Sequence, residues 1–103
     1  MIGALLELVS ETVRIGKLKK WSAGWAWWCP GCNFAHVYDQ RWQGPGDVDS
    51  PTFTPSLLIQ SSINEKPHTC HCYMTNGQIQ FLPDSSHELA GKTVPLPEWP
   101  FDE

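Results

Sequence analysis

Two cysteines separated by two residues are the first feature of this sequence that could do chemistry. Cys29 and Cys32 lie in the run Trp28-Cys29-Pro30-Gly31-Cys32, between two aromatic and β-prone stretches. A tight turn between two strands directs both thiolates to one point, which is how a zinc knuckle is built. A redox Cys-x-x-Cys pair would instead stand at a helix N-terminus within a βαβ unit, and no such pattern is visible. The spacing therefore predicts a zinc site.

The other zinc ligands must come from elsewhere in the chain. Cys70 is the best third ligand, because we expect it on the core-facing side of a β-hairpin. Three residues are candidates for the fourth position: Cys72, His36 and His68. Zinc accepts thiolate or imidazole, and alternation along the strand places Cys72 on the same side as Cys70. A closed site of this kind would be structural, because it contributes folding free energy that a small core lacks and activates no water.

A serine, a histidine and an aspartate form a second candidate site. His71 and Asp84 are expected on the hairpin face opposite to the cysteines, and Ser56 would come from a neighbouring strand. A serine nucleophile needs a base, and the base needs an orienting carboxylate, so these three residues could form a hydrolase triad. His87, which follows Asp84 by three residues, is a rival base.

A β-hairpin is the clearest element that positions these residues. Asn76-Gly77 favours a two-residue turn between strands at 69–75 and 78–82, which pairs Cys72 with Phe81. Because facing residues share one side of a sheet, this register puts the two cysteines of the hairpin on the apolar side and its histidine on the other.

The rest of the chain is also predicted to consist of strands and turns. Nine prolines and eight glycines leave room for few long helices. Pro55 cannot donate to a ladder, so the strand at 52–59 is expected at an edge or broken there. The other expected elements are a short helix or extended arm followed by a strand ending near Gly16, strands on both sides of the cysteine turn, a loop at 39–51 and an edge strand at 93–96.

These elements predict a mainly β fold, a small zinc-knuckle (zinc-ribbon-like) domain with an antiparallel sheet and little helix. A chain of 103 residues favours one domain, and six Trp, four Phe and two Tyr supply core material. We expect an N-terminal arm at 1–20, a zinc-binding β domain at 21–97 and a C-terminal tail at 98–103.

Charge and hydropathy exclude two classes of partner. The net charge of -4 argues against a nucleic-acid binder, because affinity for phosphate comes from clustered Lys and Arg. The apolar start of the chain is cut by Glu7, far short of the roughly 20 residues of a spanning helix, so no membrane partner is expected. It also lacks the features of a secretory signal. We therefore expect a cytoplasmic protein, in which cysteines serve as metal ligands and not as disulfides.

Several motifs, taken in order, resemble a known family over about residues 21–97. They are Trp28-Cys29-Pro30-Gly31-Cys32, Pro51-Thr52-Phe53-Thr54-Pro55-Ser56-Leu57, Cys70-His71, the run from Asn76 to Leu82, Asp84, and the run from His87 to Pro97. The chain resembles short zinc-binding proteins of tailed bacteriophages and prophages, often mislabelled ammonia monooxygenases. These are similar to the BubE component of bacterial ubiquitin-like conjugation operons.

The resemblance implies an enzyme, a serine peptidase that trims the C-terminal tail of a ubiquitin-like protein inside a bacterial host cell. Carried over by motif, the serine of the Pro-Ser pair is Ser56 and the histidine of the Cys-His pair is His71. Asp84 is our own choice of carboxylate, made from strand parity. The alternative is a non-catalytic phage zinc-ribbon module that binds a host or phage protein through exposed tryptophans.

The resemblance also bears on the fourth zinc ligand. Relatives commonly carry serine where this chain has Cys72, so the resemblance favours His36 instead. The expected ligand set is then Cys29, Cys32, His36 and Cys70. The oxygenase label finds no support, because we find neither two histidines and a carboxylate in a facial triad nor a copper-type cluster.

Overall fold

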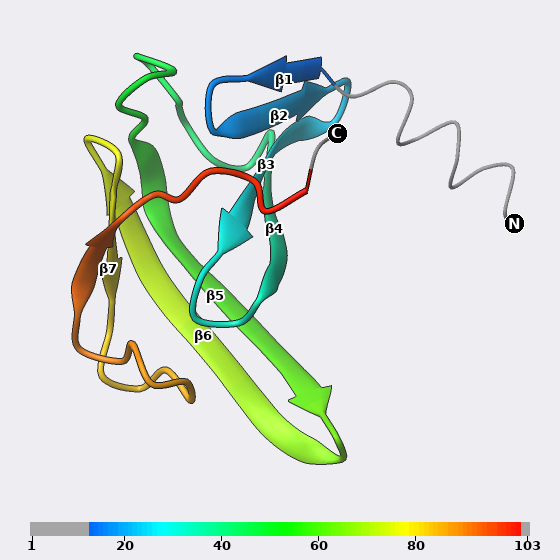
Figure 1. The fold of residues 1–103 in the computed structure, drawn as a ribbon, viewed down its shortest axis with the longest axis vertical. Coiled ribbons are helices and arrows are strands. Elements are labelled where there is room, and N and C mark those ends of the chain that lie inside the picture. Colours follow the sequence, from blue (N-terminus) through cyan, green and yellow to red (C-terminus); the bar gives the residue numbers. More distant parts are fainter. Residues whose placement is uncertain (1–12, 102–103) are drawn as a thin grey trace, which may run out of the picture.

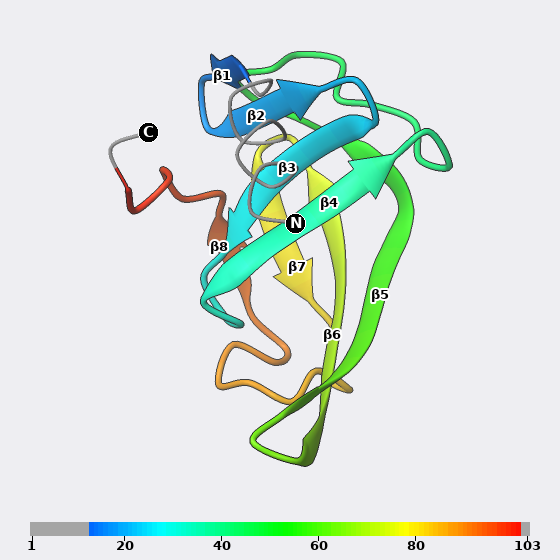
Figure 2. The same cartoon turned by 90° about the vertical axis from the view of Figure 1, so that its right-hand side faces the viewer.

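Two antiparallel sheets of four strands each pack face to face in the computed structural model, which describes residues 13–101 (Figure 1 and Figure 2). The strand orders are β1-β2-β3-β4 and β5-β6-β7-β8. The strands are β1 (Val13–Ile15), β2 (Leu18–Trp21), β3 (Gly24–Cys29), β4 (Phe34–Asp39), β5 (Phe53–Ile63), β6 (Lys66–Thr75), β7 (Gln78–Phe81) and β8 (Thr93–Pro95). Residues 13–101 include no helix, and so none that could span a membrane. The mainly β prediction is confirmed.

The first sheet is built around the cysteine turn. β3 and β4 are antiparallel with Trp27 opposite His36, and the Asn33 N–H closes the turn on the Cys29 carbonyl at 2.9 Å. Asn33 has a φ of 60°, in the left-handed region that asparagine tolerates. β1 and β2 add to β3, so this sheet extends into the segment expected to be an arm. The expected helix or arm before residue 13 lies outside the described residues.

The β6–β7 hairpin has the predicted register. Cys72 pairs with Phe81, and the turn residues Asn76 and Gly77 have φ angles of 50° and 74°. Two successive positive φ values define the type I′ turn that Asn-Gly favours. The inward-facing residues Cys70, Cys72, Met74, Ile79 and Phe81 are all buried. The alternation inferred from the sequence is therefore the alternation in the fold.

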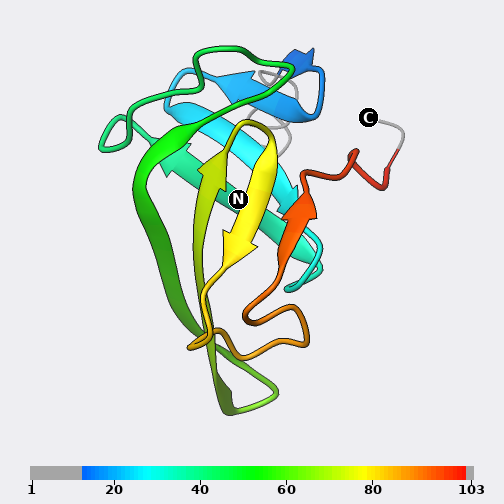
Figure 3. The ribbon, with the colours of Figure 1, turned by 90° about the vertical axis from the view of Figure 1, so that its left-hand side faces the viewer.

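β5 is an edge strand with an irregularity around Pro55, as predicted. Phe53 pairs with Met74, and the next pair is Leu57 with Cys72, so β5 uses four residues where β6 uses two. Beyond this bulge the β5–β6 hairpin continues in regular pairing and projects past the rest of the sheet (Figure 3). The predicted loop at 39–51 is joined to the edge of β5 by a bridge between Gln43 and Thr54 and by the Trp42 indole N–H, which donates to the Ser56 carbonyl at 3.3 Å.

Aromatic side chains fill the space between the sheets. Tyr38 stacks on Phe53 with ring centroids 4.1 Å apart, and Trp27 stacks on Tyr38 at 6.0 Å. The chain after the predicted edge strand β8 turns back over the first sheet, where Trp99 and Phe101 pack on Trp28. Burial of this kind is the main stabilising term in so small a domain.

Candidate functional sites

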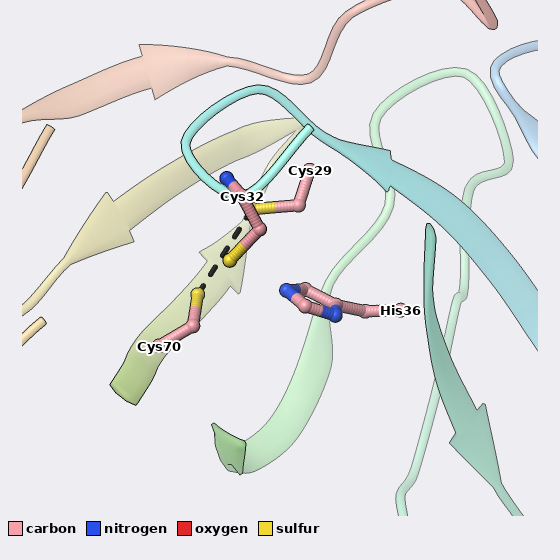
Figure 4. Close-up of side chains that lie close together, drawn as sticks. All are labelled: Cys29, Cys32, His36 and Cys70. Carbon is pink, nitrogen blue, oxygen red and sulfur yellow. Dashed lines mark hydrogen bonds between the residues drawn. The ribbon is translucent and has the colours of Figure 1, made fainter. Parts of the chain in front are cut away.

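Three cysteines and one histidine converge where the two sheets meet. Cys29 ends β3, Cys32 lies in the turn, His36 is on β4 and Cys70 is on β6. Their ligand atoms all lie within 4.8 Å of one another, close enough to bind one metal ion. The sulfur atoms of Cys29 and Cys70 are 3.9 Å apart, and the imidazole of His36 faces the three sulfurs (Figure 4). The cluster therefore links the cysteine turn of one sheet to the middle of the other.

Strand alternation and register explain this convergence. Cys29 lies on the same inner face of β3 as Trp27, and His36 lies opposite Trp27 on β4. The ring of His36 is held edge-on by Trp27 at 5.1 Å and by Phe34 at 5.2 Å. Cys70 approaches from the inner face of β6, so the three strands place their ligands on one buried point.

The donor set fits a divalent cation. His36 Nε2 is buried and has no hydrogen-bond partner among the described residues, which is costly unless another group satisfies it. Hydrogen bonds from Cys32 and Cys70 hold the pKa of the Cys29 thiol far below its ordinary value. The same contacts raise the pKa of Cys32 and of Cys70, because a proton is kept between crowded sulfurs. Three thiolates can coexist here only around a cation, and thiolate with imidazole is the chemistry that zinc prefers.

Cys72 and His68 lie outside this group of four. Cys72 is fully buried on the same face as Cys70, yet two residues along a strand advance the chain by about 6.6 Å. Alternation along the strand therefore gives the face on which Cys72 lies, but not whether its sulfur is close enough to the other ligands. His68 Nε2 is 3.1 Å from Cys32 Sγ, but His68 is not one of the four residues whose ligand atoms lie close enough to bind one ion.

Ser56, His71 and Asp84 lie together on the outer face of the second sheet. Ser56 Oγ is 3.3 Å from His71 Nε2, and His71 Nδ1 is 3.0 Å and 3.2 Å from the two carboxylate oxygens of Asp84. The side chain of His71 is 26% exposed and that of Asp84 is 58% exposed. With Nδ1–H donated to Asp84, His71 keeps Nε2 free to accept the proton of the serine hydroxyl.

Two irregular segments bring these residues together. The bulge in β5 ends at Leu57, which returns the strand to regular pairing just after Ser56. Beyond β7 the chain follows the edge of β6, where the Leu82 N–H donates to the His71 carbonyl at 2.8 Å. Asp84 is thereby held beside His71.

Ser85 is a residue of this site that sequence reasoning missed. Its hydroxyl accepts the His71 N–H at 3.1 Å and donates to the His71 carbonyl at 3.2 Å. Ser85 is only 8% exposed. The available signal was Pro83, which ends the ladder and leaves backbone groups of β6 that nearby hydroxyls must satisfy.

The rival base His87 lies elsewhere. Its ring packs on Phe81 with centroids 4.6 Å apart, and a Cβ at Gly31 would overlap it. Burial lowers the pKa of His87, and its Nδ1 accepts the Leu89 N–H at 3.2 Å. His87 thus supports the cysteine turn on the core-facing side, whereas His71 faces outward.

Comparison with known proteins assigns the chain to a family. A family described as the bacterial ubiquitination-like system serine protease (BubE) matches residues 6–82. The chain belongs to the BubE family. No curated protein and no solved structure matches it. The BubE match spans the metal cluster together with Ser56 and His71, and it ends two residues before Asp84.

Proposed function

We propose that this BubE family member is a zinc-stabilised serine peptidase that cleaves an extended peptide, the C-terminal tail of a ubiquitin-like protein. The observation that carries the proposal is the hydrogen-bonded series from Ser56 through His71 to Asp84. Serine, imidazole and carboxylate in this order are the parts of an acyl-transfer triad, and the family description names a serine protease.

The geometry supports a two-stage hydrolysis. Ser56 Oγ attacks the scissile carbonyl carbon while His71 Nε2 takes the hydroxyl proton, and His71 then protonates the departing amine. Water attacks the resulting acyl-serine with His71 again acting as base, which releases the acid and restores Ser56. Asp84 holds the imidazole in the tautomer that this sequence needs. Backbone N–H groups next to Ser56 are the candidates for stabilising the oxyanion.

Zinc would have a structural role in this scheme. Held by Cys29, Cys32, His36 and Cys70, it would supply charge neutralisation for the buried thiolates and a cross-link between the sheets. Cys70 directly precedes His71, so the ligand on the inner face fixes the backbone that carries the base on the outer face.

The surroundings of Ser56 suit a peptide substrate. Leu58, opposite His71, is 49% exposed, and Tyr73 on the same face is 42% exposed. Two open apolar side chains beside a reactive serine favour an extended peptide over a small polar molecule. All four cysteines are free thiols, which supports the bacterial cytoplasm as the place of action.

A fluorophosphonate probe tests the proposal. Such probes phosphonylate serines that a base activates, so the probe should label wild-type protein at Ser56 and leave the Ser56→Ala variant unlabelled. Ser62→Ala is the matched control, because Ser62 is an exposed serine on the same strand and should not affect labelling. Absence of wild-type labelling in folded, zinc-loaded protein would overturn the peptidase assignment.

The same experiment tests the non-catalytic alternative, in which the protein only binds a partner and the probe labels nothing. A binding module needs an open surface, yet none of the six tryptophans, all within residues 13–101, is among the exposed large apolar side chains. Cleavage of a ubiquitin-like protein extended at its C-terminus, followed by mass spectrometry, then tests the substrate class. If the probe labels Ser56 but the ubiquitin-like protein is not cleaved, the triad would be supported and the proposed substrate would be wrong.

A further inference from the structure

His68 is a polar residue that the metal cluster does not use as a ligand and that still contacts it. It lies on β6 two residues before Cys70, so both side chains point to the inner face of the sheet. Its Nε2 is 3.1 Å from Cys32 Sγ, within hydrogen-bonding distance for sulfur. The ring is flanked by Phe34 at 6.2 Å and by His87 at 6.1 Å between centroids. The two aromatic neighbours therefore restrict the orientation of the His68 ring beside Cys32.

Cys32 is the cluster sulfur that lies nearest to solvent. Cys29 and Cys70 are fully buried, whereas Cys32 is 9% exposed and is the member of the three nearest to solvent. Cys29 Sγ already accepts the N–H of Cys32 at 3.4 Å. Three thiolates around a divalent cation leave excess negative charge, and N–H groups that donate to sulfur offset that charge.

We propose that His68 donates its Nε2–H to the Cys32 thiolate when the four-residue site holds zinc, and that this hydrogen bond slows loss of the metal. Release of zinc begins when one sulfur dissociates and takes up a proton or meets a competing ligand. The most exposed thiolate is where this step starts, and a donor on its lone pair makes that thiolate less basic. The inference concerns the metal site alone and stands independently of the peptidase proposal.

Matched variants of the intact chain test this role. His68→Phe keeps an aromatic ring between Phe34 and His87 but removes the donor, and His68→Gln keeps a donor. Zinc transfer from loaded protein to the chelator pyridylazoresorcinol should be about 10–100-fold faster in His68→Phe. His68→Gln should lie close to wild type. Thr75→Val, which removes a hydrogen-bonding group from an exposed position at the far end of β6, is the control and should release zinc at the wild-type rate.

The outcomes that overturn the proposal are equally specific. Equal release rates for His68→Phe and wild type would remove the donor role. Loss of bound zinc below one equivalent in His68→Phe, with a cobalt spectrum changed in its ligand-field bands, would make His68 a ligand.

A measurement on wild-type protein covers the case in which His68→Phe fails to fold. In protein loaded with NMR-active cadmium, scalar coupling between the metal and the His68 Nε2 proton reports a hydrogen bond through sulfur. Coupling to the carbon-bound ring protons would instead report direct ligation and overturn the proposal. Lack of any coupling to His68 would overturn it as well.

Discussion

At the scale of single residues, Asp84 has the most sharply defined task in the proposed mechanism. It accepts the Nδ1–H of His71 through two oxygens, at 3.0 and 3.2 Å, and so selects the tautomer that leaves Nε2 free. In Asp84→Asn the amide nitrogen can donate to Nδ1 and favour the opposite tautomer. The rate of fluorophosphonate labelling should then fall by up to roughly 10⁴-fold.

Stability separates this effect from a structural one. The Asp84 side chain is 58% exposed, so its exchange for the isosteric amide should leave the melting temperature almost unchanged. Asp47→Asn, in the exposed loop before β5, is the control for labelling. Labelling of Asp84→Asn at the wild-type rate would mean that His71 needs no orienting carboxylate.

Cys70 and Cys72 provide a second test at this scale, because they differ only in their reach. Both are completely buried on one face of β6, but only Cys70 belongs to the cluster of four. Cys70→Ala should abolish stoichiometric zinc binding, while Cys72→Ala should keep one zinc per chain and lose about 1 kcal/mol of stability from a small cavity. Elemental analysis of purified variants measures this. Zinc-free Cys72→Ala protein with intact circular dichroism would identify Cys72 as a ligand.

At the scale of elements, the segment after β7 joins the two halves of the triad. Ser85 satisfies both backbone groups of His71, and the N–H of Ser86 donates to the Thr69 carbonyl at 2.8 Å. The segment therefore replaces a missing strand along the edge of β6. Its serine hydroxyls form the hydrogen bonds to β6 that a neighbouring strand would otherwise form. These bonds hold Asp84 within hydrogen-bonding distance of His71.

Ser85→Ala should weaken this attachment. The substitution leaves the half-buried N–H of His71 without its partner, which costs about 1–3 kcal/mol, while the His71 carbonyl keeps the Leu82 N–H. Urea denaturation should register that loss, and labelling of Ser56 should slow because Asp84 and His71 no longer share one rigid segment. Ser62→Ala is again the matched control, since its hydroxyl lies on the exposed part of β5. An unchanged free energy of unfolding would show that the Ser85 hydroxyl does not stabilise the fold.

The elements also show what local sequence signals can and cannot supply. The β6–β7 hairpin was predictable in register because Asn76-Gly77 fixes the turn and alternation fixes the faces. The side of the sheet for His71 and Asp84 followed from the same parity. The addition of β1 and β2 to the first sheet, the size of the β5 bulge and the docking by Ser85 did not, because each depends on pairing between distant segments.

The fourth ligand illustrates the same division. Parity favoured Cys72 and correctly gave its face, but which side chain completes the cluster depends on how two sheets are placed against each other. Figure 2 shows β4 crossing over the second sheet, and this crossing brings the His36 ring to Cys70. Only tertiary packing sets that relation, so spacing along the chain leaves several candidates open.

At the scale of the whole molecule, the cluster forms part of the core that the two sheets share. The two sheets share one aromatic layer, and at one end of it the packing atoms are sulfur and imidazole instead of hydrocarbon. Without a cation these groups are crowded, partly unsatisfied donors and acceptors. With a cation they become a cross-link between β3, β4 and β6.

Removal of the metal should therefore unfold the protein and abolish labelling of Ser56 as a consequence. Binding free energy at a structural zinc site is folding free energy, so a chelator should cause loss of the β-sheet circular dichroism signal and of fluorophosphonate labelling together. Returning zinc should restore both. Chelated protein that keeps its spectrum and its labelling would contradict a structural role for the metal.

Exchange of the metal separates a structural ion from a reacting one. The cluster lies on the inner side of the second sheet and Ser56 on its outer side, so in the proposed mechanism no ligand of the ion would face the carbonyl that Ser56 attacks. Cobalt or cadmium, which accept the same tetrahedral thiolate and imidazole set, should give folded protein that labels Ser56 at the rate of the zinc form. A labelling rate that changed with the identity of the metal would mean that the ion takes part in the reaction. Ser56 would then no longer account for the reaction on its own.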